Sequence, residues 1–94
     1  MTGSENDTGG RAGNPSAMPY VPAPEKLPGF PNAERAEPKS RRRRWIDPKG
    51  RILEWDYQHG TVEVYDRRGR HLGEFDPTSG RRLKGPDRTR RAEP

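Results

Sequence analysis

The stretch "EWDYQHGTVEVY", residues 54–65, decides the fold, because polar and apolar residues alternate on both sides of a His-Gly pair. Alternation with a period of two is typical of a half-buried strand. If His59 and Gly60 form a two-residue turn, Asp56 faces Glu63 across the hairpin. One face then collects the apolar residues, which are Leu53, Trp55, Tyr57, Val62 and Val64. The other face collects Glu54, Asp56, Glu63 and Tyr65, with His59 at the turn.

Two interpretations of this acidic face remain open. Opposed carboxylates destabilise a sheet unless something compensates for them. Arginines on neighbouring strands could neutralise the acids, and a single histidine in a turn is often only a turn residue. Alternatively, the acids and His59 form an acid/base site, and the basic chain around them, with a net charge of +5, suits a polyanionic substrate.

Outward from this hairpin, residues 41–94 read as short β-type runs separated by turn signals. "DPKG" at 47–50 and "DPTSG" at 76–80 are typical turn sequences. The pattern predicts a mainly β fold, a small and highly twisted antiparallel meander of about five short strands. The expected strands lie within residues 41–46, 51–57, 61–66, 71–75 and 81–85.

The first 40 residues differ in composition, since they hold seven of the eleven prolines and four Lys or Arg against five Asp or Glu. Residues 41–94 hold fifteen Lys or Arg against nine acids, so the basic charge belongs to the second part. We expect a flexible tail at 1–18, a Pro-rich extended segment at 19–40 that packs on the domain, and an antiparallel β domain at 41–94. Asn32–Glu37 could form one helical turn, the only helix expected.

Several classes of protein are disfavoured by what the sequence lacks. There is no cysteine and there are two histidines, so neither a disulfide framework nor a zinc site is expected, and no cofactor is predicted. No apolar run is long enough to span a membrane, and the N-terminus does not read as an export signal. If the protein acts outside its producer, we expect another component to carry it.

Metal-free cleavage of RNA explains why these residue types would occur together. It needs a base for the ribose 2′-hydroxyl, an acid for the leaving 5′-oxygen and a cation for the phosphorane charge. A carboxylate, an imidazole and an arginine supply these groups. DNA lacks the 2′-hydroxyl, so the same set would be inert on it.

The segments "EWDYQHGTVEVY" and "HLGEFDPTSGRRLKGPD" also carry a family resemblance. They resemble the cytotoxic ribonuclease domain of the ribosome-inactivating colicins and cloacin, with E-W-D-x-Q-H-G-x-x-E followed by H-L-G-x-F-D-P-x-x-G-x-x-L-K-G-P-D. Including "RRRRW" and, more loosely, "YVPAP", the resemblance covers roughly residues 19 to 91. It implies a twisted antiparallel sheet that cuts one phosphodiester in the decoding centre of small-subunit ribosomal RNA, in the cytoplasm of a target bacterium.

The resemblance also implies site residues and partners. The catalytic positions of the family correspond here to Asp56, His59, Glu63 and Arg90. Either Glu63 is the general base and His59 the general acid, with Asp56 supporting the imidazolium, or the roles of Glu63 and His59 are exchanged. Arg90 would stabilise the transition state. The implied partners are the ribosome, an acidic immunity protein, and carrier or translocation domains encoded elsewhere.

This sequence departs from the family pattern at two positions. Family members often have a glutamate two residues after the histidine, and this chain has Thr61, so an accessory role for that acid is in doubt here. Val21 stands where a histidine is common, which argues against a role for that position.

Seven of the other basic residues are expected to contact phosphates, while His71 reads as structural and Trp45, Trp55 and Phe75 as core. The predicted RNA-binding residues are Arg41, Arg42, Arg43, Arg44, Lys84, Arg88 and Arg91. Because Arg88, Arg90 and Arg91 lie so close together, the catalytic arginine could be a neighbour of Arg90. The alternative function is a non-catalytic basic module that binds RNA or ribosomes.

Overall fold

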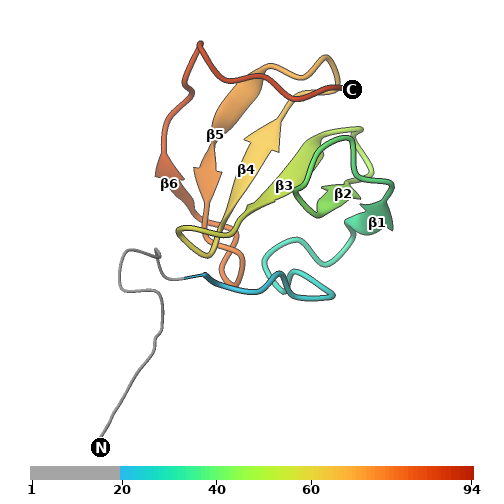
Figure 1. Cartoon of the computed structure of the whole chain (residues 1–94), viewed down its shortest axis with the longest axis vertical. Coiled ribbons are helices and arrows are strands. Elements are labelled where there is room, and N and C mark those ends of the chain that lie inside the picture. The colour runs from blue at the N-terminus through green and yellow to red at the C-terminus, as the bar shows by residue number, and fades with distance from the viewer. Residues whose placement is uncertain (1–19) are drawn as a thin grey trace, which may run out of the picture.

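A computed structural model describes residues 20–94, which form one antiparallel sheet of six strands. The strands are β1 (Glu34–Ala36), β2 (Arg44–Ile46), β3 (Ile52–Asp56), β4 (Thr61–Tyr65), β5 (His71–Phe75) and β6 (Arg82–Lys84). Each strand pairs with the next one in the sequence, and the sheet twists strongly (Figure 1). The predicted mainly β, antiparallel fold is confirmed. The predicted flexible tail, residues 1–18, lies outside the described residues.

Residues 20–94 contain no helix, and so none that is long and apolar enough to cross a membrane. The sequence allowed at most one short helical turn at residues 32–37, and this segment supplies β1 instead. Arg35 on β1 pairs with Trp45 on β2, which adds a sixth strand to the expected five. An isolated helical turn gains very few hydrogen bonds, whereas the edge of β2 offers a ready backbone ladder.

An aspartate opens four of the turns between strands and caps each of them in the same way. The carboxylate of Asp47 accepts hydrogen bonds from the backbone N–H groups of Lys49 (2.9 Å) and Arg51 (2.8 Å). The other three turn aspartates, each of which also accepts two backbone N–H groups, are Asp56, Asp66 and Asp76. A side chain that caps its own turn in this way favours a reversal of the chain at that point.

The central hairpin has a different register from the predicted one. The structure pairs Asp56 with Thr61, so the loop contains four residues rather than two. The reason lies in Asp56, whose carbonyl accepts the N–H of Gly60 (2.8 Å) while its carboxylate caps the loop. The partner of each β3 residue on β4 differs from the predicted one by two positions. Because two is an even number, the predicted division between polar and apolar faces is retained.

The apolar face forms the core and is covered by residues of the Pro-rich segment. The buried cluster consists of Leu27, Trp45, Leu53, Trp55, Val62 and Val64. Both indoles donate to backbone carbonyls of the covering segment, Trp55 to Val21 (2.8 Å) and Trp45 to Glu25 (3.2 Å). These bonds satisfy the polar atom of each buried tryptophan and attach residues 20–33, the part of the segment that precedes β1 and contains no strand.

Two glycines allow this segment to approach the turn between β5 and β6. The N–H of Gly29 donates to the carbonyl of Pro77 (2.7 Å). A Cβ atom on Gly29 would lie 2.3 Å from the backbone nitrogen of Gly80, which itself has a φ of 76°. The two backbones therefore touch at a point where no side chain fits.

The exposed turn aspartates make the stability of the fold depend on pH. Backbone N–H groups, chiefly that of Arg70 for Asp66 and that of Ser79 for Asp76, hold the pKa of each carboxyl below its usual value. A depressed pKa in the folded state adds stability above the unfolded pKa of about 3.9. That stability is lost as the pH falls through the lower, folded pKa.

We therefore predict that Asp76→Asn, which keeps an oxygen acceptor but removes the charge, is less stable than the wild type at pH 7. The difference in the free energy of unfolding should shrink as the pH falls below about 4, where the wild-type carboxyl also loses its charge. Urea unfolding at pH 7 and pH 3 measures this, with Glu93→Gln in the exposed C-terminal segment as the matched control. A difference that stays constant on acidification would contradict the prediction.

Candidate active site

A row of charged side chains crosses five strands on the polar face of the sheet. Glu63 on β4 lies directly opposite Glu54 on β3 and Glu74 on β5. Cations stand at both ends of the row, with Arg44 opposite Glu54 and Lys84 opposite Glu74. Opposed like charges destabilise a sheet, so each glutamate in this row requires a compensating partner.

Glu54 is neutralised by the strand next to it. Its Oε2 accepts hydrogen bonds from the Nη2 (2.7 Å) and Nε (3.2 Å) of Arg44, and both side chains are buried. For this acid, the interpretation that a neighbouring arginine neutralises the face is correct. Arg44 was predicted to bind phosphate, but its guanidinium is buried against Glu54 and is not at the surface.

Asp56 and His59 form a pair at the end of β3. The Asp56 Oδ2 lies 2.8 Å from the His59 Nδ1, and its Oδ1 accepts the N–H groups of Gln58 and His59. Burial alone would raise the pKa of Asp56, but the hydrogen bonds from His59 and Gln58 outweigh it and lower this pKa. The ring of His59 is half exposed, and with Nδ1 occupied by Asp56, its Nε2 is the nitrogen available to a ligand.

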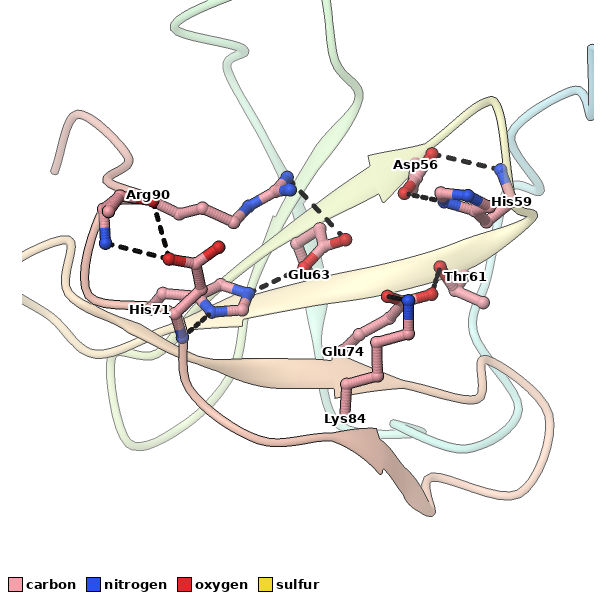
Figure 2. Close-up of polar contacts among 10 residues, drawn as sticks. Asp56, His59, Thr61, Glu63, His71, Glu74, Lys84 and Arg90 are labelled. Atoms are coloured by element: carbon pink, nitrogen blue, oxygen red, sulfur yellow. Dashed lines mark hydrogen bonds and ion pairs between the residues drawn. The ribbon is translucent and has the colours of Figure 1, made fainter. Parts of the chain in front are cut away.

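Glu63 is buried at the centre of the row and lies between a histidine and an arginine (Figure 2). Its Oε1 is 2.7 Å from the Nε2 of His71, and its Oε2 is 3.7 Å from the Nη2 of Arg90. The first contact fixes the carboxylate in place. The second distance exceeds that of a hydrogen bond, so Oε2 faces a cation without being fully engaged by it.

His71 is a member of the site that sequence reasoning read only as structural. Its Nδ1 accepts the backbone N–H of Asp87 (2.9 Å), so this network assigns the ring proton to Nε2, which donates to Glu63. The signal in the sequence was weak, because His71 lies eight residues from Glu63. Only the pairing of β4 with β5 brings the two side chains together.

Arg90 reaches the site because the C-terminal segment crosses the end of the sheet where β4 joins β5 (Figure 1). Arg91 forms a bridge with Arg70, and Ala92 donates to the carbonyl of Gly69 (3.0 Å). Gly69 has a φ of 86°, and a Cβ there would collide with the carbonyl oxygen of Ala92. The close crossing of the two segments thus depends on a glycine at position 69.

The surroundings of Arg90 keep its positive charge. Burial would lower its pKa, but a contact with the Tyr65 hydroxyl and the charges of Glu63 and Asp56 raise this pKa above the ordinary value. The pKa of Tyr65 is in turn raised, mainly by burial, so its hydroxyl stays protonated at neutral pH. Arg90 is therefore held as a cation that both acids of the site influence.

The structure brings the four predicted catalytic residues to one face, as two adjacent pairs (Figure 2). Asp56 with His59 forms one pair, and Glu63 with Arg90 forms the other. Asp56 is a diagonal neighbour of Glu63 across β3 and β4, which corresponds to about 7–8 Å in an antiparallel ladder. Whether these residues catalyse a reaction stays a prediction.

The predicted RNA-binding residues have different surroundings. Arg42 and Arg43 are half-buried, and Arg43 contacts Glu25 (3.6 Å), whereas Arg41 is exposed. Lys84, 71% exposed, lies 3.8 Å from the carboxylate of Glu74. Arg88 and Arg91 are exposed and line a cleft of about 450 Å³ together with Asp66, Arg70, His71, Leu72, Pro86 and Arg90. Arg70 thus joins the basic residues next to the site, although the sequence did not single it out.

Asp56, His59 and Glu74 have polar atoms within 4.8 Å of one another. One cation could touch all three side chains, but each already has a protein partner, which for Glu74 is the hydroxyl of Thr61 (2.8 Å). The prediction of chemistry without a cofactor stays a prediction.

The comparisons with known proteins agree on one family. A family model described as Cytotoxic matches residues 21–93. Over 79 aligned residues, the chain is 49% identical to colicin E3, 43% identical to colicin-E6 and 42% identical to cloacin, all from Escherichia coli. Each alignment covers 72% of this chain and 14% of the relative. Since the match includes all six strands and every residue of the site, this chain belongs to the Cytotoxic family, the toxin domains of colicin-like bacteriocins.

Proposed function

We propose that this domain is an endoribonuclease toxin that cuts RNA by metal-independent attack of a ribose 2′-hydroxyl. The observation that carries the proposal is the placement of two complementary pairs on one face, His59 with Asp56 and Glu63 with Arg90. The resemblance to the family supports a specific substrate. The proposed substrate is small-subunit ribosomal RNA, cut in the decoding centre. The cut would be made in the cytoplasm of a target bacterium and would stop translation.

His59 is suited to act as the general acid. Asp56 occupies Nδ1 and orients the ring, so that Nε2, on a half-exposed side chain, presents its proton to the leaving 5′-oxygen. The carboxylate of Asp56 also favours the imidazolium that carries this proton.

Glu63 is suited to act as the general base. His71 holds Oε1 by a hydrogen bond, and Oε2 remains free of a hydrogen bond of its own within the described residues, although it faces Arg90. A fixed carboxylate oxygen can accept the proton of the 2′-hydroxyl as that oxygen attacks phosphorus. The products would be a 2′,3′-cyclic phosphate and a free 5′-hydroxyl.

Arg90 is suited to stabilise the phosphorane. Its guanidinium lies beside the base, where the attacked phosphate must sit, and its raised pKa keeps the cation charged throughout the reaction. The neighbouring cleft continues the positive surface away from the site through exposed arginines. Phosphates that flank the cut would lie along that cleft.

The first test concerns the proton transfers. We predict that His59→Ala and Glu63→Gln each lower the rate of RNA cleavage about a hundredfold to ten-thousandfold, because each removes one proton-transfer group. RNA binding should largely survive, since the exposed arginines remain. Primer extension on treated ribosomes, combined with detection of 2′,3′-cyclic phosphate ends, measures cleavage.

Gln58→Ala is the matched control, since the exposed side chain of Gln58 belongs to the same loop and only its backbone supports Asp56. It should cleave at the wild-type rate. EDTA should leave wild-type cleavage unchanged, and a substrate with a 2′-deoxyribose at the cut should resist it. A wild-type protein that binds ribosomes but leaves the RNA whole would instead indicate the non-catalytic binding module.

The second test separates the arginines of the C-terminal segment. We predict that Arg90→Lys lowers kcat with little change in KM, because a lysine keeps the charge but cannot reproduce the planar guanidinium. Arg88→Ala should mainly raise KM and reduce the dependence of binding on salt concentration. Equal effects of the two substitutions on kcat would show that Arg90 has no special part in the reaction.

The third test concerns a protective partner. We propose that an acidic immunity protein binds this domain, as the family resemblance implies, because a free ribosomal nuclease would harm its producer. Its association with a chain of net charge +5 should be fast and should slow markedly as ionic strength rises. Stopped-flow measurement of association at low and high salt tests this, and equal rates would count against electrostatic steering.

A further inference from the structure

Glu74 is a buried carboxylate that the proposed reaction does not yet use. It lies on β5 directly opposite the proposed base Glu63. One of its oxygens also lies within 4.8 Å of polar atoms of both Asp56 and His59 (Figure 2). Glu74 therefore stands beside the acid and the base at once.

The surroundings of Glu74 do not explain its presence by stability. It is the third glutamate in a row of opposed acids, which is unfavourable for the sheet. Its neighbour Lys84 is 3.8 Å away and 71% exposed, so solvent screens most of that attraction. A buried carboxylate at such a position, beside both the proposed acid and the proposed base, points to a part in the chemistry.

Thr61 links Glu74 to the feature in which this sequence departs from its relatives. The Thr61 hydroxyl donates to the Oε2 of Glu74 at 2.8 Å. The family resemblance implies a glutamate at position 61, where this chain has Thr61, and Glu74 brings a carboxylate to the same neighbourhood from the adjacent strand. The acid absent from β4 has a counterpart on β5.

We propose that Glu74 is a positioning residue that acts through His59, favouring the imidazolium form from which the proton passes to the leaving 5′-oxygen. This inference rests on the proposed ribonuclease function. Two carboxylates then flank the ring, Asp56 at Nδ1 and Glu74 from the neighbouring strand. Both favour the cation by direct charge interaction.

The other charged groups around His59 alter this balance only in part. On β4, Glu63 adds a third negative charge, although the cation of Arg90 lies beside it. On β6, Lys84 opposes the effect of Glu74 but is well solvated. The sum remains negative around the ring, so His59 should keep its proton to higher pH than it would without Glu74.

The test replaces Glu74 by its neutral isostere. Glu74→Gln keeps an oxygen that can accept from Thr61 but removes the charge. We expect the alkaline limb of the pH–rate profile to move to lower pH by about half to one unit, because charges at this separation interact by roughly that amount. At pH 8, kcat should fall about threefold to tenfold, with little loss at pH 6 and little change in KM. Glu93→Gln, which makes the same change at an exposed tail position, should leave the profile unchanged.

A rescue experiment separates an electrostatic role from a structural one. Thr61→Glu in the Glu74→Gln background returns a carboxylate to the neighbourhood from β4. It should restore at least half of the lost kcat at pH 8 and move the alkaline limb back. A double variant as impaired as Glu74→Gln would overturn the electrostatic role.

A readout without RNA keeps this inference distinct from the proposed function. NMR signals of the His59 ring, followed against pH in the folded proteins, should report that the ring gains its proton at lower pH in Glu74→Gln than in the wild type. If the wild type fails to cut RNA, the nuclease proposal fails, and the NMR comparison still decides whether Glu74 acts on His59. Identical curves would overturn the inference, and if Glu74→Gln does not fold, Glu74→Ser makes the same comparison with a smaller neutral side chain.

Discussion

Three glutamates face one another on adjacent strands, and much of the remaining structure supplies their partners. Glu54 forms an ion pair with Arg44 on β2, and Glu63 contacts His71 and Arg90. Glu74 accepts a hydrogen bond from Thr61 and lies 3.8 Å from the exposed Lys84. Removing one partner of a buried charge is far more harmful than the pair is beneficial, because the remaining charge is left unsolvated. Strand β2 and the C-terminal crossing are thus tied to the centre of the sheet by charge as well as by backbone pairing.

One face of the sheet forms the apolar core and the other carries the ionisable groups, a division that suits a chain with a small core. One face buries both tryptophans under a Pro-rich segment that has few strand-type hydrogen bonds of its own. The other face is left mainly to ionisable groups, with Ile52 and Tyr65 buried at one end of it. A domain of this size cannot bury a large core, so covering one face with an extended segment is an efficient way to gain apolar contact area.

The sequence predicted the division of faces but not the details that depend on distant contacts. The alternation of polar and apolar residues predicted which side chains of β3 and β4 share a face. This assignment is correct even though the loop after Asp56 is two residues longer than expected. The family resemblance, rather than spacing, singled out Arg90. The burial of Arg44 could not be predicted from "RRRR", because the four residues are identical in sequence. Only Arg44 is buried with Glu54, since the pairing of β2 with β3 begins at this residue. Likewise, β1 exists only because β2 offers an edge, which a local helical propensity cannot reveal.

The contact between Gly29 and the turn at Gly80 bears on how the chain folds. All strand pairs join neighbours in sequence, so the sheet can form through short loop closures, which are fast. The contact between residues 29 and 80 instead closes a loop of about fifty residues, at a higher entropic cost. We expect the meander to assemble first and residues 20–33, the part of the Pro-rich segment before β1, to dock afterwards. Until it docks, Trp45 and Trp55 lack their carbonyl partners, so the final step of folding is also the one that removes the apolar face from water.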